Sequence, residues 1–233
     1  ITASNQNTIT NNGMLAITDT EKNMGIMLSN FDTMILNNKG STLNINNGNI
    51  MIKIANNKNL INNKGTVNIN GGTIESAGTN TIGIYNSGEL IMNAGQLVSS
   101  NYYENKCIEN IGKVNIKDGI LTAKEGSWDI GAIVNYKELY IEGGEINSER
   151  VGITNSTSGE LIGKIKITGG KITTKGKGIF NYGNSEVEII NVEMVSEAEG
   201  IYNYNNAKIQ IEGGSINAKC EGIYNNCISV III

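Results

Sequence analysis

Residues 83–99 read GIYNSGELIMNAGQLVS, and this stretch decides the fold. It contains three short apolar runs, centred on Ile84, Leu90 and Leu97, which are separated by turns of small and polar residues. Within each run, apolar residues alternate with other residues, and this period of two is typical of a strand with one buried face. The stretch therefore predicts three short strands joined by two tight turns.

The same unit returns along most of the chain, and an asparagine just after the first apolar run marks each copy. Successive copies of this asparagine lie 20 to 26 positions apart. A period of this length is typical of solenoids, in which one supersecondary unit stacks on copies of itself. The nine predicted members of this column are Asn38, Asn63, Asn86, Asn110, Asn135, Asn155, Asn181, Asn203 and Asn225.

A turn before the third run keeps the same period. Its column reads Gly48, Gly72, Gly95, Gly119, Gly144, Gly170, Val192 and Gly214. Aligned on both landmarks, the inward positions are aliphatic, and a column of small residues follows them from Ser76 to Ala218. The chain is thus predicted to be an all-β parallel β-helix of nine or ten coils, with three short strands per coil of about 22–26 residues and coils about 4.8 Å apart. Residues 37–233 are expected to be regular, and residues 1–36 to form an irregular N-terminal coil.

Coils of this length with an asparagine ladder in one tight turn resemble the right-handed parallel β-helix of the pectin-lyase-like superfamily, over roughly residues 37–226. The Gly-Ile-Tyr-Asn and Ile-Glu-Gly-Gly-x-Ile motifs are more similar to the non-catalytic β-helical repeats of bacterial surface proteins and adhesins than to the lyases. The resemblance implies an extracellular or cell-surface location. The ladder also has a reason independent of family, because a side-chain amide both donates and accepts, so stacked asparagines bond to each other and to buried turn backbone.

Composition excludes several classes of protein. With 233 residues, 29 Gly, no Pro and 5% aromatic residues, the chain is expected to be one elongated domain with an aliphatic core. A net charge of −4 gives no electrostatic footprint for nucleic acid. No apolar run approaches the length of a membrane span, so membrane insertion is not expected. Three cysteines do not predict a disulfide framework, and a pairing of Cys220 with Cys227 is left open.

One outward column alternates in sign through six consecutive coils. Its members are Glu89, Lys113, Glu138, Lys164, Glu186 and Lys208. In-register stacking sets each charge beside an opposite one, and a slip by one coil would set Glu against Glu. We expect this structural charge ladder to fix the register of the coils and to leave no cleft on its face.

The catalytic residues of the lyases and glycosidases with this fold are missing. Those enzymes use carboxylate clusters, often with calcium, together with Arg, Lys or His, whereas this chain has no His and a single Arg, Arg150. The outward pair Glu186 and Glu188 has the spacing of a glycosidase pair, but two solvated glutamates are the favoured interpretation. The four Asp residues fall at unrelated places in the repeat: Asp19, Asp32, Asp118 and Asp129. We therefore expect no enzyme activity, no cofactor and no metal.

Aromatic residues give candidate ligand-binding positions in two regions. Tyr102, Tyr103 and Trp128 lie in two of the longer predicted loops, where they either stack on sugar rings or cover a corner of the solenoid. The second set is an outward column with two neighbours just after the ladder asparagine: Phe180, Tyr202, Tyr224, Tyr182 and Tyr204. This set is either a partner surface or a stack of rings between coils.

The sequence begins and ends part-way through a coil, and uncapped coils expose sheet edges. We expect either further coils of a longer chain or end-to-end self-association into a filament. The favoured function is a non-enzymatic extracellular structural or adhesive module of a bacterial surface protein. The alternative is a carbohydrate-binding adhesin domain that uses the loop aromatics on a glycan or host surface, and a polysaccharide lyase or glycoside hydrolase is least favoured.

Overall fold

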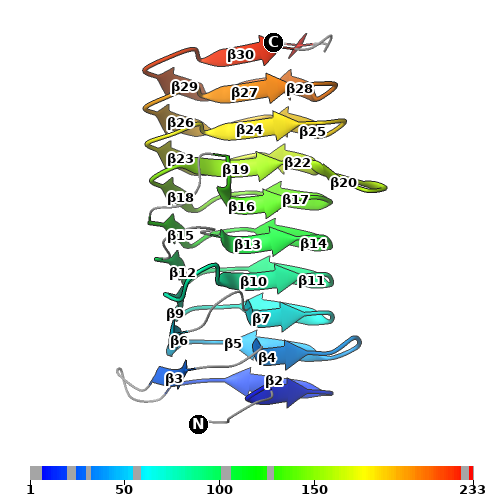
Figure 1. Ribbon diagram of the computed structural model, residues 1–233, viewed down its shortest axis with the longest axis vertical. Helices are drawn as coiled ribbons and strands as arrows, with labels where there is room; N and C mark the ends of the chain where they lie inside the picture. Colours follow the sequence, from blue (N-terminus) through cyan, green and yellow to red (C-terminus); the bar gives the residue numbers. More distant parts are fainter. Residues whose placement is uncertain are drawn as a thin grey trace.

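The computed structural model describes residues 7–19, 25–29, 33–54, 59–100, 106–124, 129–226 and 231–232. Over these residues the chain winds into a parallel β-solenoid whose coils stack from the N-terminal to the C-terminal end (Figure 1). The coils supply strands to three sheets, which we call A, B and C in the order in which a coil visits them. The predicted all-β solenoid with three strands per coil is confirmed.

Sheet A holds the first strand of each coil. Its ten described strands are β1 (Ile9–Asn11), β4 (Thr33–Asn37), β7 (Asn59–Asn63), β10 (Ile82–Asn86), β13 (Lys106–Asn110), β16 (Gly131–Asn135), β19 (Val151–Asn155), β24 (Ile179–Tyr182), β27 (Ile201–Tyr204) and β30 (Ile223–Asn226).

Sheet B holds the second strand of each coil. Its ten described strands are β2 (Met14–Ile17), β5 (Thr42–Ile45), β8 (Thr66–Ile69), β11 (Glu89–Met92), β14 (Lys113–Ile116), β17 (Glu138–Ile141), β22 (Lys164–Ile167), β25 (Glu186–Ile189), β28 (Lys208–Ile211) and β31 (Ile231–Ile232).

Sheet C holds the third strand. Its nine described strands are β3 (Gly25–Ser29), β6 (Asn49–Ile54), β9 (Thr73–Ser76), β12 (Gln96–Ser99), β15 (Ile120–Ala123), β18 (Glu145–Ser148), β23 (Lys171–Thr174), β26 (Glu193–Ser196) and β29 (Ser215–Ala218). In all three sheets each strand pairs in parallel with the strand of the next coil, so that Leu90 lies between Val67 and Val114.

Residues 9–29 follow the coil plan more closely than we expected. Strands β1, β2 and β3 pair in parallel with β4, β5 and β6, so this segment already contributes one strand to each sheet. The departure from regularity is a register shift between Leu28 and Ser29, where β3 pairs with β6. The segment lacks the glycine turn that marks later copies, and for this reason the sequence predicts an irregular coil here.

The core is a set of aliphatic columns that run along the axis of the solenoid. Strand alternation sends every second residue inward, and in-register stacking then places like residues on one another. The first sheet A column is completely buried from Ile84 to Ile201. In sheet C an aliphatic column is followed by small buried residues, which are Ser76, Ser99, Ala123, Ser148, Thr174 and Ser196. The predicted inward columns therefore form one continuous core.

The glycine turn before sheet C is required by both conformation and space. Gly72 has a φ of 79°, and a Cβ at this position would clash with the carbonyl of Gly48 in the preceding coil. Adjacent turns therefore approach too closely for a side chain that points along the axis. Val192 occupies this column without a left-handed backbone and is 2% exposed, so its coil turns differently and buries an extra aliphatic side chain.

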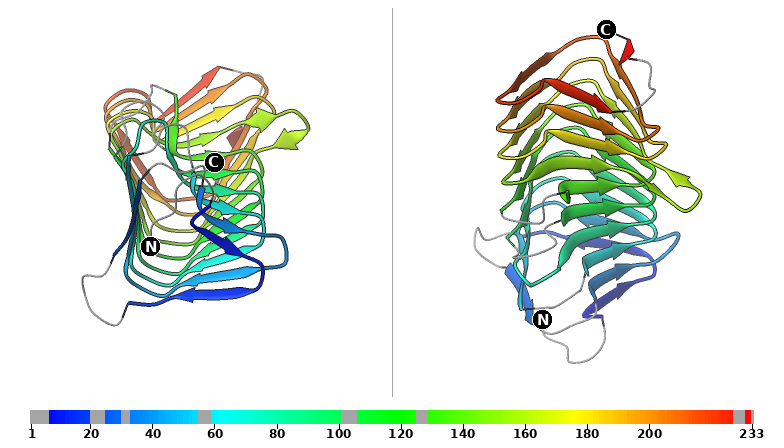
Figure 2. Two further views of the ribbon diagram at one scale, coloured as in Figure 1. Left: turned by 60° about the horizontal axis from the view of Figure 1, so that its bottom comes forward. Right: turned by 45° about the horizontal axis from the view of Figure 1, so that its top comes forward.

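A β-hairpin interrupts the corner between sheets A and B in one coil. Strands β20 (Thr157–Ser158) and β21 (Leu161–Ile162) pair antiparallel between β19 and β22. They project sideways from the stack in every view (Figures 1 and 2). The strands on either side stay in register with their neighbours, since β19 pairs with β24 and β22 pairs with β17. The sequence analysis did not predict this hairpin.

Candidate functional site

An internal ladder of asparagines runs along the corner where sheet A turns into sheet B. In every rung the side-chain Nδ2 of one asparagine donates to the Oδ1 of the asparagine one coil further on, over 2.7–2.9 Å. Its described members are Asn11, Asn37, Asn63, Asn86, Asn110, Asn135, Asn155, Asn181, Asn203 and Asn225. Those from Asn37 to Asn203 are completely buried.

One predicted member lies outside this ladder. Asn38 is half-buried, and its Nδ2 donates to Asn12 at the surface, whereas the preceding residue Asn37 occupies the ladder position. The ladder asparagine always follows the inward residue of its strand by two positions, as Asn37 follows Ile35. Counting from that inward residue would have selected Asn37 and would also have added Asn11.

The ladder side chains from Asn11 to Asn181 make a second hydrogen bond between coils. Their Nδ2 also donates to the backbone carbonyl that opens the sheet B strand of the next coil, for example from Asn63 to Glu89 over 2.8 Å and from Asn181 to Lys208 over 3.0 Å. These carbonyls lie at a corner where the chain leaves the sheet ladder, so they would otherwise be buried without a donor. The buried ladder thus fixes the backbone of the residues that form the outer charge ladder.

The structure places the six predicted charges in one outward column of sheet B. The six residues form five consecutive in-register pairs of opposite charge. Measured between nitrogen and oxygen, Lys113 lies 3.2 Å from Glu89, and Lys208 lies 3.1 Å from Glu186. Lys164 approaches Glu186 from the other side at 3.5 Å. The hydrogen bond from Lys208 is the main cause that lowers the pKa of Glu186 below its usual value.

The structure contains further charge columns that the sequence analysis did not identify. On sheet C, Lys171 lies between Glu145 and Glu193 in register, and its Nζ is 2.6 Å from Glu193 Oε1. At the corner after sheet C, a column of alternating sign consists of Glu149, Lys175, Glu197 and Lys219. Within it the Lys175–Glu149 and Lys219–Glu197 ion pairs measure 2.9 and 3.3 Å. A second column of sheet B pairs Lys166 with Glu188 at 2.7 Å.

These columns have a common pattern. All charged side chains of one coil are lysines, and all charged side chains of the next coil are glutamates. Between residues 161 and 185 the only charged residues are five lysines, and between 186 and 207 the only charged residues are five glutamates. Each glutamate follows its lysine by 22 positions, which gives the pairs 164/186, 166/188, 171/193, 175/197 and 177/199. The hydrogen bonds that Lys166, Lys171 and Lys175 donate to Glu188, Glu193 and Glu149 are the main cause that raises the pKa of these lysines.

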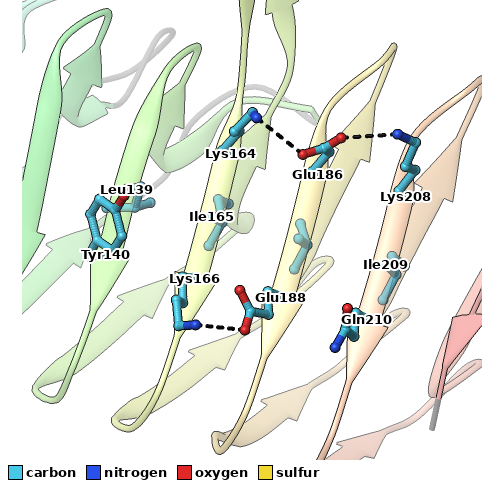
Figure 3. A pocket seen from close by; sticks show the side chains of 11 residues that line it. Leu139, Tyr140, Lys164, Ile165, Lys166, Glu186, Glu188, Lys208, Ile209 and Gln210 are labelled. Carbon is cyan, nitrogen blue, oxygen red and sulfur yellow. Dashed lines mark hydrogen bonds and ion pairs between the residues drawn. The ribbon is translucent and has the colours of Figure 1, made fainter.

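Contrary to our expectation, the charged face of sheet B carries a shallow trough. It has a volume of about 450 Å³ and spans strands β17, β22, β25 and β28. One row of side chains is Lys164, Glu186 and Lys208, and the other begins at Tyr140 and continues with Lys166, Glu188 and Gln210 (Figure 3). The two rows lie two residues apart along each strand, about 6.6 Å. The charged side chains therefore line the two sides of a trough, whereas we expected a face without a cleft.

Within that trough, Glu186 and Glu188 do not have the environment of a glycosidase pair. Glu186 is held between Lys164 and Lys208, and Glu188 is hydrogen-bonded to Lys166 over 2.7 Å. A general acid needs a raised pKa, whereas the pKa of Glu186 is lowered. The arrangement favours two carboxylates that pair with lysines of neighbouring coils.

The second aromatic set forms a continuous strip on the outer face of sheet A. Tyr182 stacks on Tyr204 with ring centroids 5.8 Å apart, and Tyr202 stacks on Tyr224 at 4.7 Å. Phe180 contacts Tyr202 edge-on at 5.6 Å, and the Nζ of Lys177 lies 5.0 Å from the ring centroid of Phe180. Ring faces that pack on one another are not free to stack on a sugar. The geometry therefore favours stacking between coils.

The remaining candidates are placed as follows. Tyr102, Tyr103 and Trp128 lie outside the described residues, as does Cys227. Cys220 is an exposed free thiol. Cys107 is a buried free thiol whose Sγ donates to the carbonyls of Leu97 and Thr122, and burial raises its pKa to about 12.

No group of three or more metal-binding side chains occurs among the described residues. The described part of the chain also contains no helix that is long and apolar enough to cross a membrane. Comparisons with protein families, with curated proteins and with solved structures found no match to this chain. The assignment to the parallel β-solenoids therefore rests on the strand pairing and the asparagine ladder alone.

Proposed function

We propose that this chain is a non-enzymatic structural module of a bacterial surface protein, in which the solenoid acts as an extracellular rod. One observation carries the proposal: polar side chains, inside and outside, bond to the same position of the next coil along the axis. Such bonds resist the separation of coils and leave the carboxylates of Glu186 and Glu188 paired with lysines. The extracellular setting rests on the resemblance of the Gly-Ile-Tyr-Asn and Ile-Glu-Gly-Gly motifs to surface-protein repeats.

Antibodies raised against the purified chain test the setting. They should label intact cells of the organism that carries the gene, and labelling that requires permeabilised cells would overturn the extracellular part of the proposal. A culture that lacks the gene is the control.

A hydrolysis assay tests the non-enzymatic part. The purified chain, incubated with acidic and neutral polysaccharides with and without calcium, should release no reducing ends and no unsaturated products. Turnover that is abolished in Glu186→Gln and retained in Glu193→Gln, which changes a carboxylate of sheet C, would assign an enzyme to the sheet B trough.

A second candidate function is a carbohydrate-binding adhesin. Tyr182 and Tyr204 favour it because they remain 38% and 40% exposed despite their mutual stacking. On a glycan array, Tyr182→Ala/Tyr204→Ala tests the strip on sheet A, and Tyr102→Ala/Tyr103→Ala/Trp128→Ala tests the loop aromatics. A signal that both triple and double variants retain would place binding elsewhere.

A further inference from the structure

We propose that the charged face of sheet B is a self-complementary docking surface, on which a second copy of this chain packs face to face with its solenoid axis antiparallel. The surface consists of the outward residues of β17, β22, β25 and β28, and we call it the B face. Its first row is Glu138, Lys164, Glu186 and Lys208, and its second row is Tyr140, Lys166, Glu188 and Gln210.

The order of signs makes the first row self-complementary. A two-fold axis that runs parallel to the strands, between β22 and β25, reverses the row without mixing the two rows. Glu138 then faces Lys208 of the second copy, and Lys164 faces its Glu186. Because a two-fold axis generates each contact twice, all four charges of one copy meet opposite charges of the other.

The second row fits the same axis. Lys166 faces Glu188 of the second copy, and Tyr140, which is 37% exposed, faces Gln210, whose amide can bond to a phenol hydroxyl. A shift of the axis by one strand keeps the first row complementary but places Glu188 opposite Asn115 and Lys166 opposite Tyr140. The second row therefore selects one register among those that the first row permits.

A parallel arrangement is disfavoured by the same side chains. A two-fold axis along the solenoid would place the first row of one copy on the second row of the other at the same coil. Lys164 would then face Lys166, and Glu186 would face Glu188, because both rows have the same sign within a coil. Like charges in contact suppress that orientation.

The size of the B face predicts a weak dimer. Four strands spaced by about 4.8 Å and four residues of about 3.3 Å each give about 250 Å² of sheet, which is well below the roughly 800 Å² per partner of a standard interface. The trough of about 450 Å³ leaves room for the long lysine and glutamate side chains of the second copy. Association should therefore depend on protein concentration and disappear when salt screens the charges.

Sedimentation velocity tests the association. The wild-type chain should form a reversible dimer at low ionic strength and become monomeric at about 1 M salt, where the Debye length is about 3 Å. A chain that stays monomeric at low salt over the accessible concentrations would overturn the proposal, as would a dimer that survives high salt.

A charge-swapped variant tests the pairing rule. Lys164→Glu/Lys166→Glu/Glu186→Lys/Glu188→Lys keeps each lysine beside a glutamate across β22 and β25, and the swapped face is again complementary to itself. It should form its own dimer yet bind the wild-type chain about tenfold more weakly, because like charges then face each other. The control Lys171→Glu/Glu193→Lys makes the same swap on sheet C and should pair with the wild type normally. Equal binding of both variants to the wild type would contradict the B face.

A crosslink tests the orientation and needs no variant. Within one chain, Glu138 and Lys208 are three strands apart, about 14 Å, which is too far for a zero-length bond. Carbodiimide treatment of a mixture of isotope-labelled and unlabelled chains at low salt should join them between copies, seen as a mixed-isotope peptide pair. Crosslinked dimers without this pair would exclude the antiparallel register.

Discussion

The coils before residue 100 and the coils after residue 138 share one interior but are joined differently on the outside. In the first group, neutral amides bond to one another: Asn68 donates to Asn44 over 2.8 Å, and Asn93 donates to Asn70 over 2.8 Å. In the second group, lysine and glutamate take the corresponding positions, as in the Lys166–Glu188 pair. The same backbone is therefore held in register by two kinds of side-chain chemistry.

The difference shows what each chemistry can specify. Stacked asparagines bond equally well to any other asparagine, so a slip by one coil preserves their bonds. Alternating charges change sign with such a slip, so a slip by one coil sets like charges beside each other. The amides thus strengthen the stack, and the charges distinguish one coil from the next.

The largest effect is expected when the asparagine ladder, which both groups of coils share, is interrupted. Asn63→Ala and Asn181→Ala each remove a completely buried ladder side chain and take one ladder hydrogen bond from the asparagine on either side. Each should lower the free energy of unfolding by about 2–3 kcal/mol, measured by urea denaturation. Costs that differ clearly between the two variants would show that the interiors of the two groups are not equivalent.

A reversal of sign should affect only the later coils. Lys164→Glu/Lys166→Glu/Lys171→Glu sets three glutamates against Glu186, Glu188 and Glu193, and the melting temperature should fall by several degrees at low salt because like charges then face each other across adjacent strands. The matched variant with three glutamines separates repulsion from lost attraction and should fall less. The further changes Glu186→Lys, Glu188→Lys and Glu193→Lys should restore part of the stability, because Glu138, Glu145 and Lys208 still face like charges in adjacent strands. A triple reversal without effect would show that the charges do not fix the register.

Acid and alkali should loosen the later coils first. The pKa of Glu186 is lowered in the folded chain, so its contribution to stability is complete above its ordinary value of 4.5 and is lost as the pH falls from there through the folded pKa. The pKa of Lys166 and of Lys171 is raised, so their contribution is complete below 10.5 and is lost as the pH rises through the folded pKa. Hydrogen-exchange protection factors should show both changes in residues 164–211 and not in residues 42–93.

The smallest effect is expected at an exposed amide. Asn70→Ala breaks two surface hydrogen bonds, to Asn46 and from Asn93. The cost should be about 0.5 kcal/mol or less and should not change with salt. If the change in the free energy of unfolding caused by Asn70→Ala depended on salt, the proposed difference between the two groups of coils would be contradicted.

The sequence predicts the interior well because each inward position repeats. Columns such as Ile84 to Ile201 can be aligned without a structure, and the two turn landmarks confirm the alignment. The same alignment selected the wrong residue of the Asn37–Asn38 pair. Either asparagine fits the column by residue type, and only the spacing from Ile35 shows that Asn37 occupies the ladder position.

The outer surface was harder to predict for a physical reason. The first charge column was visible because its residues keep one position in every coil, but the pairing of whole coils needs five separate columns to be read together. The trough depends on how two rows of side chains stand on the sheet, which no one-dimensional pattern records. The aromatic strip was located correctly, whereas the direction of its ring faces could come only from coordinates.

The β20–β21 hairpin has a consequence for how such a protein can change over generations. Six more residues lie between Asn155 and Lys164 than between Asn135 and Glu138, yet the strands on both sides keep their partners. An insertion at a corner therefore leaves the strand pairing of the neighbouring coils unchanged. New surface can arise there by insertion, one coil at a time, while the interior is inherited unchanged.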